Sequence, residues 1–333
     1  QTAHYVDCFT TVSEITNNEC RELLDKPADV VLMNGFEDDF VPKGATFTGK
    51  RKRARSTMLR VANCLLGEDL GDDTLIIGTS GRYEFKNKGI DVFLESLNRL
   101  NRDKDLKKKV LAFVNVPSWV GDPREDLQKR LKSKDKFTEP LQCPFITHWL
   151  HNMTHDQVLD MLKYLGMGNR PEDKVKVIFV PCYQDGHDGI LNKHYYDLIL
   201  GEDLSVYPSY YEPWGYTPLE SVAFRVPTIT TDLAGFGLWV NSLKNQHGIN
   251  DGVEVLHRSD YNYSEVADGI KDTVALFSTK TEAEIKEIRK RAGQVAEQAL
   301  WKHFIQYYYE AYDIALRNAM KLSLIHISEP TRH

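Results

Sequence analysis

Residues 208–220 read Pro208-Ser209-Tyr210-Tyr211-Glu212-Pro213-Trp214-Gly215-Tyr216-Thr217-Pro218-Leu219-Glu220. A short β-prone segment precedes this stretch, and apolar residues at helical spacing follow it, which predicts a strand, a loop and a helix in that order. Thr217 suits the N-cap of this helix, Pro218 its first position, and Glu220 the third position of a capping box. The sequence therefore predicts that a helix begins directly after the loop.

The predicted helix start favours the binding of an anion. The first amide hydrogens of a helix have no partners within it, and the helix dipole is positive at this end, so a phosphate group binds readily there. Two carboxylates, Glu212 and Glu220, flank this position. A capping box accounts for Glu220 without any ligand. Glu212 precedes Pro213 in a loop and has no capping role, so the alternatives for it are a solvated loop acid and a functional carboxylate.

Strand and helix patterns alternate along the middle of the chain. The predicted elements are strands at 74–79, 110–116 and 175–180 and a helix at 88–100. This alternation predicts an α/β fold with a parallel sheet. Arg82 and Lys88 follow the first of these strands, and we expect them at the carboxyl edge, where open α/β sheets bind their ligands.

Shorter patterns predict further elements toward both ends. They are strands at 6–12, 30–33 and 228–230, a helix at 15–24 capped by Ser13, a short helix at 195–200, and long helices at 281–301 and 304–320. The basic run at 50–55 is interpreted as a solvated helix face, because a helical pattern follows it. Residues 121–173 are polar and only weakly periodic.

Composition indicates an ordinary globular protein. The chain has 333 residues, of which 41% are hydrophobic and 27% charged, and its net charge is −6. This charge gives no general argument for nucleic acid or membranes, and no apolar stretch approaches the ~20 residues of a membrane span. The five cysteines are scattered, which favours a reducing compartment and indicates neither a disulfide framework nor a zinc site. Three histidines, at 148, 151 and 155, have no framing carboxylate at the spacing of a helical metal site.

Several motifs together resemble one known family. The stretch 208–220, with its Glu-x7-Glu spacing, resembles the signature of the glycogen synthases of the animal and fungal type. Those proteins are retaining glucosyltransferases of the GT-B type, in which two Rossmann-like domains face each other across a cleft. Four other motifs resemble that family in the same order: Phe9-Thr10-Thr11-Val12-Ser13-Glu14-Ile15-Thr16, Gly81-Arg82-Tyr83-Glu84-Phe85-Lys86-Asn87-Lys88-Gly89, Lys174-Val175-Lys176-Val177-Ile178-Phe179 and Thr231-Asp232-Leu233-Ala234-Gly235-Phe236-Gly237. The resemblance extends from about Phe9 to about Trp301.

The resemblance implies a division of the chain. Residues 1–42 would end the N-terminal Rossmann-like domain, 43–73 would connect the domains, 74–300 would form the C-terminal nucleotide-sugar-binding domain, and 301–322 would form a helix that packs back on the first domain. Residues 323–333 continue neither the helical period nor the family pattern and are predicted to be a non-native tail. In the family, the first domain has a Lys-x-Gly-Gly loop near its start that binds the donor. This chain has no such loop, and it begins without a methionine. We therefore expect a fragment in which the N-terminal Rossmann-like domain is largely missing.

The activity that the resemblance implies is glucosyl transfer from a nucleotide sugar to the non-reducing end of an α-1,4-glucan, with retention of configuration. UDP-glucose is favoured over ADP-glucose as the donor. Glu212 would contact the transferring glucose, while Arg82 and Lys88 would hold the departing diphosphate. The donor-binding residues would be Tyr195, stacked on the base, the amides of Gly215, Tyr216 and Thr217 at the diphosphate, and Glu220 at the ribose.

No metal and no other cofactor is expected from the resemblance. The expected partners are the nucleotide-sugar donor and a glycogen or other α-glucan acceptor, with no nucleic acid and no membrane. The protein is expected in the cytoplasm, and a homo-oligomer is possible. Two alternatives stay open: a non-catalytic fragment that binds nucleotide or glucan, and another retaining GT-B glucosyltransferase. The full-length parent is expected to be an enzyme and the fragment alone to be inactive.

One departure from the family concerns regulation. The animal and fungal enzymes have an arginine-dense helix that binds the phosphate of glucose-6-phosphate, since repeated guanidinium forks can hold a dianion. The corresponding helix here has only Arg289, Lys290 and Arg291 near its middle, with Glu287 and Glu297 where further positive charge would be needed. We therefore expect no activation by glucose-6-phosphate.

Overall fold

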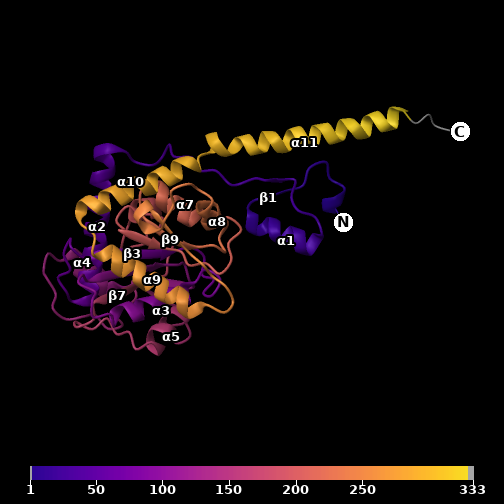
Figure 1. Ribbon diagram of the computed structural model, residues 1–333. Coiled ribbons are helices and arrows are strands. Elements are labelled where there is room, and N and C mark those ends of the chain that lie inside the picture. The colour runs from indigo at the N-terminus through magenta and orange to yellow at the C-terminus, as the bar shows by residue number, and fades with distance from the viewer. Residues whose placement is uncertain (1, 329–333) are drawn as a thin grey trace.

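A six-stranded sheet is the centre of the structure, a computed structural model that describes residues 2–328 (Figure 1). Its strands lie in the order β10-β9-β8-β3-β4-β7, and every neighbouring pair is parallel. The predicted α/β fold with a parallel sheet is therefore confirmed. The strands are β3 (Leu75–Ser80), β4 (Val110–Asn115), β7 (Val175–Val180), β8 (Leu204–Val206), β9 (Thr228–Thr231) and β10 (Val253–Leu256).

Helices cover both faces of the sheet because alternate strand residues point to opposite faces. In β4, for example, Ala112 and Val114 face one helical layer and Phe113 faces the other. The first layer contains α3 (Ile90–Asn101), α5 (Gln157–Tyr164) and α9 (Tyr263–Ser278), and the second contains α2 (Gly44–Leu66), α4 (Glu125–Lys132) and α6 (Tyr195–Ile199). A third core group joins α7 (Tyr216–Ala223), α8 (Gly235–Asn241) and α10 (Glu282–Gln298) around Phe224 and Phe236.

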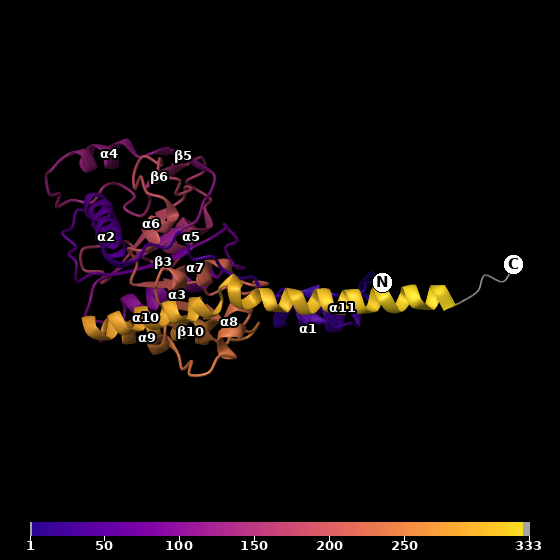
Figure 2. The same ribbon diagram turned by 90° about the horizontal axis from the view of Figure 1, so that it is seen from above.

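The long helix α11 (Trp301–Ser328) extends from the sheet and runs beside the N-terminal segment in both views (Figures 1 and 2). Asn318 of α11 donates a hydrogen bond to the Asp7 carbonyl at 2.8 Å. The other elements are η1 (Thr2–His4), β1 (Thr10–Thr11), α1 (Glu14–Leu24), β2 (Val30–Val31), the antiparallel pair β5 (Val120–Pro123) and β6 (His148–Leu150), and η2 (Ile249–Asp251). Within residues 2–328, no helix has both the length and the apolar character that crossing a membrane requires.

The main differences from the predicted elements are the following. The strand predicted at 6–12 is reduced to two residues, because it pairs only over the length of β2. Helix α11 continues through Ser328, so the predicted end of the helical period at 322 is wrong; residues 329–333 of the predicted tail lie outside the described residues. The weakly periodic section after residue 121 contains β5, α4, β6 and α5. Ser13 caps α1 through a capping box with Thr16, as predicted.

The interpretation of the basic run at 50–55 as a solvated helix face is right for residues 52 and 53, which are exposed, but it is wrong for two of the arginines. Arg51 and Arg55 of α2 turn inward, and their guanidinium groups donate to the two oxygens of Asp203 at 2.7 and 2.8 Å. The Ile76 amide donates to the same carboxylate at 2.8 Å. Burial would raise the pKa of Asp203, but the charges of Arg55 and Arg51 outweigh it and hold this pKa below its usual value. The two arginines share a helix face because they are four residues apart.

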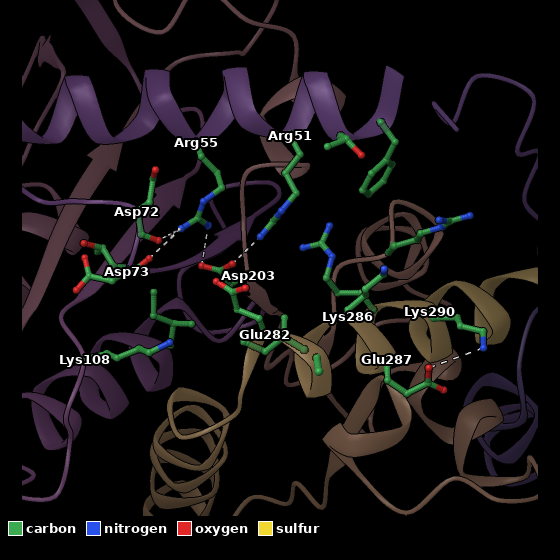
Figure 3. Close-up of a pocket in the computed structure, with 18 of the residues that line it drawn as sticks. Arg51, Arg55, Asp72, Asp73, Lys108, Asp203, Glu282, Lys286, Glu287 and Lys290 are labelled. Carbon is green, nitrogen blue, oxygen red and sulfur yellow. Dashed lines mark hydrogen bonds and ion pairs between the residues drawn. The ribbon is translucent and has the colours of Figure 1, made fainter. Parts of the chain in front are cut away.

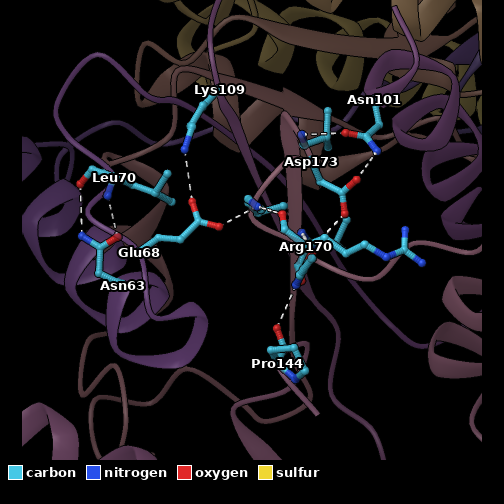
Figure 4. Close-up of polar contacts among 12 residues, drawn as sticks. Asn63, Glu68, Leu70, Asn101, Lys109, Pro144, Arg170 and Asp173 are labelled. Carbon is cyan, nitrogen blue, oxygen red and sulfur yellow. Dashed lines mark hydrogen bonds and ion pairs between the residues drawn. The ribbon is translucent and has the colours of Figure 1, made fainter. Parts of the chain in front are cut away.

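A buried ion pair ties the end of α2 to the sheet. Lys176 of β7 is fully buried, and its ammonium lies 2.5 Å from Oε1 of Glu68. Lys109 approaches the other oxygen of Glu68 at 3.2 Å. Figure 4 shows Glu68 pointing toward Lys109, beside the turn that Asn63 closes by two hydrogen bonds to the Leu70 backbone. The carboxylate of Glu68 thus neutralises the buried ammonium of Lys176.

A further buried acid lies against β3. A Cβ on Gly78 of β3 would overlap the Glu202 carboxyl group, so glycine makes room for this side chain. Ser205 donates a hydrogen bond to Glu202 at 2.6 Å. Burial raises the pKa of Glu202 to about 8. Burial thus favours the neutral, protonated form of Glu202 in the folded protein.

We expect Glu68→Gln to lower the free energy of unfolding by about 3 kcal/mol, because it leaves the buried ammonium of Lys176 without its carboxylate. Asp69→Asn is the matched control. Asp69 pairs with Lys136, and both side chains are more than two thirds exposed, so this change should stay within ~0.5 kcal/mol. Urea unfolding followed by circular dichroism measures both variants. Equally small losses would show that the buried pair adds no net stability.

Glu202 should make the stability of the fold depend on pH. Because its pKa rises from 4.5 to about 8 on folding, the folded protein binds more protons than the unfolded chain within this window, and stability should fall as the pH rises through it. We expect Glu202→Gln to remove a decline of a few kcal/mol between about pH 5 and pH 8. Urea unfolding at both pH values tests this, with Glu297→Gln, at an exposed position of α10, as the control. An unchanged pH dependence in Glu202→Gln would contradict the expectation.

Candidate active site

The loop that leaves β8 and leads into α7 is held by its backbone on both sides. The Tyr210 amide donates to the Asn87 carbonyl at 2.8 Å, and the Glu212 amide donates to the Leu233 carbonyl at 3.0 Å. The Glu212 carbonyl in turn accepts from the Gly235 amide at 3.0 Å. Glu212 is thus fixed between two other loops at the carboxyl edge of the sheet.

The structure brings Lys88 and Glu212 together. Their side chains form an ion pair and are only 14% and 19% exposed. Lys88 directly precedes Gly89, the N-cap of α3. A lysine ammonium, which can bind a phosphate, and a carboxylate therefore lie side by side at this edge of the sheet.

Arg82 does not join this pair. Its side chain is 77% exposed and lies 3.1 Å from Glu84, two residues further along the same loop. The structure therefore places Arg82 on the loop that carries Lys88, with its guanidinium turned to the solvent.

The prediction that Thr217 and Glu220 form a capping box at the start of α7 is wrong. The helix begins at Tyr216 with Gly215 as its N-cap, and no side chain, Thr217 included, forms a hydrogen bond at the cap. Gly215 has φ +109°, a conformation that glycine adopts readily and that begins the helix before the predicted Thr217. Glu220 consequently lies one turn into the helix, where it accepts a hydrogen bond from the Tyr196 hydroxyl at 2.9 Å. Burial raises the pKa of Glu220.

The start of α7 still offers free backbone donors. Pro218 is the third residue of the helix, not the first, and it is tolerated there because amides of the first turn have no partner within the helix. The amides of Tyr216 and Thr217 precede it. They are available to an anion at the carboxyl edge of the sheet.

Tyr195 begins α6 at the same edge. Its hydroxyl group forms a hydrogen bond with the hydroxyl of Ser80, the last residue of β3, at 3.0 Å. Burial raises the pKa of Tyr195 well above its usual value, so the phenol stays neutral. Tyr195 thus lies next to the loop that carries Arg82 and Lys88.

Of the two groups of possible metal ligands among the described residues, one is largely buried. The ligand atoms of His148, Cys182 and Asp188 lie within 4.8 Å of one another. Both ring nitrogens of His148 are already engaged, with the Thr147 hydroxyl at 2.8 Å and the Asp188 carbonyl at 2.7 Å. The Asp188 carboxylate accepts three backbone amides of its own loop. These contacts account for the group as a support for the loop.

A basic cleft of about 1020 Å³ lies apart from the Lys88–Glu212 pair, between α2 and α10. Figure 3 shows Arg51 and Arg55 pointing from α2 toward Asp203 on one side of it, with Lys286 and Lys290 of α10 on the other. The basic residues that line the cleft are Arg51, Arg55, Lys108, Arg225, Lys286, Arg289 and Lys290.

The arginines of α10 differ in their partners. Arg289 is buried, and neither of its Nη atoms has a hydrogen-bond partner among the described residues. Burial, together with the nearby charge of Arg51, lowers the pKa of Arg289 to about 9. Arg291 does not line the cleft and binds Asp251 at 2.9 Å. The prediction about glucose-6-phosphate considered only the basic residues of the helix that is now α10. It missed the basic side chains that α2 and Arg225 contribute to the cleft.

Sequence reasoning also missed Arg258. This residue follows β10, so its place directly after a strand was the available signal. Its guanidinium donates to the Pro208 carbonyl at the beginning of the loop that bears Glu212.

Comparison with known sequences finds one family. The chain matches the family described as glycogen synthase over residues 1–129 and 124–330. It is 29% identical to glycogen [starch] synthase isoform 2 of Saccharomyces cerevisiae, covering 95% of this chain and 54% of that protein. It is 28% identical to the glycogen [starch] synthase of Neurospora crassa, covering 96% and 53%. The chain thus spans about half the length of the curated relatives it matches.

Comparison with solved structures supports the fold. The catalytic domain of starch synthase IV from Arabidopsis thaliana, bound to ADP and acarbose, aligns with a TM-score of 0.55 at 12% identity, covering 92% of this chain and 55% of that one. Sucrose-phosphate synthase from Thermosynechococcus elongatus aligns with a TM-score of 0.51 at 15% identity, covering 98% and 60%. These neighbours are glycosyltransferases of the GT-B type. Because the family match extends over nearly all of the sequence, the chain belongs to the glycogen synthase family.

Proposed function

We propose that this chain forms the donor-binding side of a glycogen synthase that transfers glucose from a nucleotide sugar to the non-reducing end of an α-1,4-glucan, with retention of configuration. The observation that carries the proposal is the Lys88–Glu212 pair, which lies at the carboxyl edge of the sheet beside the start of α7. Membership of the family supports the same activity. The family resemblance, rather than a contact in the structure, favours UDP-glucose over ADP-glucose.

The proposed chemistry follows from where charge develops. Departure of the nucleoside diphosphate leaves a cationic sugar ring and adds negative charge to the leaving phosphate. The Lys88 ammonium and the amides of Tyr216 and Thr217 would stabilise that phosphate, and Gly215 lets the backbone approach it closely. Donor binding would thus draw Lys88 from Glu212, whose carboxylate would then face the sugar ring.

The remaining predicted residues complete the donor site in this proposal. Arg82, exposed in the structure, would turn from Glu84 to the diphosphate. Tyr195 would stack on the base, and Glu220 would accept a hydrogen bond from the ribose in place of Tyr196. The family resemblance implies a same-face transfer. The acceptor hydroxyl would form the new glycosidic bond on the face from which the diphosphate departs, and its proton would pass to the leaving phosphate, without a metal.

The proposal extends to partners and to the size of the active unit. The partners would be a nucleotide-sugar donor and an α-glucan acceptor in the cytoplasm, without nucleic acid or membrane, in a protein able to form a homo-oligomer. The proposed domain limits are those that the resemblance implies, with 74–300 as the donor-binding domain. The 333 residues alone would bind the donor without catalysis, because the relatives they match are about twice as long.

The test of this function is Glu212→Ala in the full-length protein that contains this chain. We expect glucosyl transfer to fall on the order of 100-fold or more, because a loop carboxylate beside the sugar stabilises the transition state. Thermal unfolding should be unchanged, and donor affinity should persist because Lys88 stays free to bind phosphate. Glu297→Ala, at an exposed position of α10, is the control. Near-normal turnover in Glu212→Ala would exclude the role, and absence of transfer in the wild-type protein would favour a non-catalytic binding fragment or another donor.

We further expect that millimolar glucose-6-phosphate does not activate this enzyme. Arg51 and Arg55, which line the basic cleft, already bind Asp203, and Arg291, which lies outside the cleft, binds Asp251, so these guanidinium groups are not free to hold a phosphate dianion. Transfer rates with and without the effector test this. Activation of several-fold would contradict it, and loss of that activation in Arg289→Gln would then locate the effector at the unpaired guanidinium.

A further inference from the structure

We propose that Arg258 is a positioning residue that holds the loop bearing Glu212 at its working distance from Lys88. This inference rests on the function proposed above, and it assigns to the reaction a residue that would touch neither the donor nor the acceptor.

Arg258 is anchored on its own side of the sheet edge. It lies two residues after β10, is 6% exposed, and its amide donates to Oδ1 of Asp232 at 2.9 Å. Its guanidinium reaches the loop after β8, donates to the Pro208 carbonyl and lies over the Tyr210 ring at 5.5 Å. Arg258 therefore contacts the loop at two places, two and four residues before Glu212.

Gly89 also packs against the Pro208 carbonyl. This glycine has φ +70°, and a Cβ on it would overlap the Pro208 carbonyl, so the two backbones are in direct contact. The residue before Gly89 is Lys88. One carbonyl group thus contacts both the guanidinium of Arg258 and the backbone that carries the cation of the ion pair.

A carboxylate of α3 completes this arrangement. Asp91 follows Gly89 by two residues, and its Oδ1 is buried without a hydrogen-bond partner among the described residues. Burial lowers the pKa of Arg258, and the negative charge of Asp91 opposes that effect. The guanidinium therefore couples electrostatically to the helix that follows Lys88 while it bonds to the loop that precedes Glu212.

This geometry predicts a particular kinetic signature. Donor affinity would come from Lys88, the start of α7 and Tyr195, whereas the hydrogen bond of the Arg258 side chain goes to Pro208. Glu212 acts in the transition state, so an error in its position should lower kcat and leave the KM for the donor nearly unchanged. A residue that merely stabilised the core would lower the temperature of unfolding without separating these two constants.

The experiment compares three variants of the full-length protein, assayed below their unfolding temperatures. We expect Arg258→Gln to lower kcat at least ~10-fold with the donor KM within ~3-fold of the wild type. Arg258→Lys should recover part of kcat, since lysine keeps the charge and one donor but not the planar fork. Arg130→Gln is the matched control. Arg130 likewise donates to backbone carbonyls, those of Cys64 and Glu139, and lies over an aromatic ring, that of Phe137, but it does so between α2 and α4.

Hydrogen exchange gives a second readout that does not depend on turnover. The amides of Tyr210 and Glu212 donate to carbonyls of neighbouring loops, so they should exchange ~10-fold faster in Arg258→Gln, while the amides of β4 stay protected. Normal kcat in an active Arg258→Gln enzyme, or unchanged exchange of both loop amides, would overturn the proposal. A wild-type protein without glucosyl transfer would refute the proposed function, and hydrogen exchange would still decide whether Arg258 positions the loop.

Discussion

Parallel pairing of all six strands is the constraint on which the rest of the structure depends. A parallel strand needs a crossover to reach its neighbour, and the crossover helices bury both faces of the sheet. The strands β3, β4 and β7 accordingly contribute apolar residues to the cores on both faces. The same rule brings every carboxyl end to one edge. Lys88 and Glu212 are 124 residues apart in sequence, yet they meet there because each follows a strand of that sheet.

The interior shows how this fold accommodates charge. Asp203 is matched by two arginines, Lys176 is matched by Glu68, and burial favours the neutral form of Glu202. Each arrangement avoids an uncompensated buried charge, which would cost several kcal/mol. The Lys88–Glu212 pair has a comparable exposure, at 14% and 19%, so its position at the carboxyl edge of the sheet, and not its burial, distinguishes it from the pair of Arg51 and Asp203.

The comparisons separate what the fold shows from what the sequence shows. Solved neighbours with 12–15% identity share the sheet and its helices, so the architecture alone is common to enzymes of differing specificity. The family assignment rests on the sequence match, which includes the loop motifs at the carboxyl edge. Loops at that edge can vary without disturbing the layers beneath them, because the core is formed by the strands and helices. Specificity in this protein is therefore expected to reside in the loops after β3, β8, β9 and β10.

Local periodicity determined much of the architecture from the sequence alone. The predicted β7 has its observed bounds, β3, α3 and β4 lie within about two residues of theirs, and Ser13 caps α1, because strand alternation, helical spacing and capping act over a few neighbouring residues. The Glu-x7-Glu stretch likewise indicated a loop at the carboxyl edge. The tertiary structure alone decided that Arg51 and Arg55 bind Asp203, that Glu220 turns to Tyr196, that Arg82 faces solvent, and that Arg258 grips the Pro208 carbonyl. Except for Arg82, each of these contacts joins residues that are 24 to 152 positions apart, so their partners are set by how strands and helices pack and not by any local pattern.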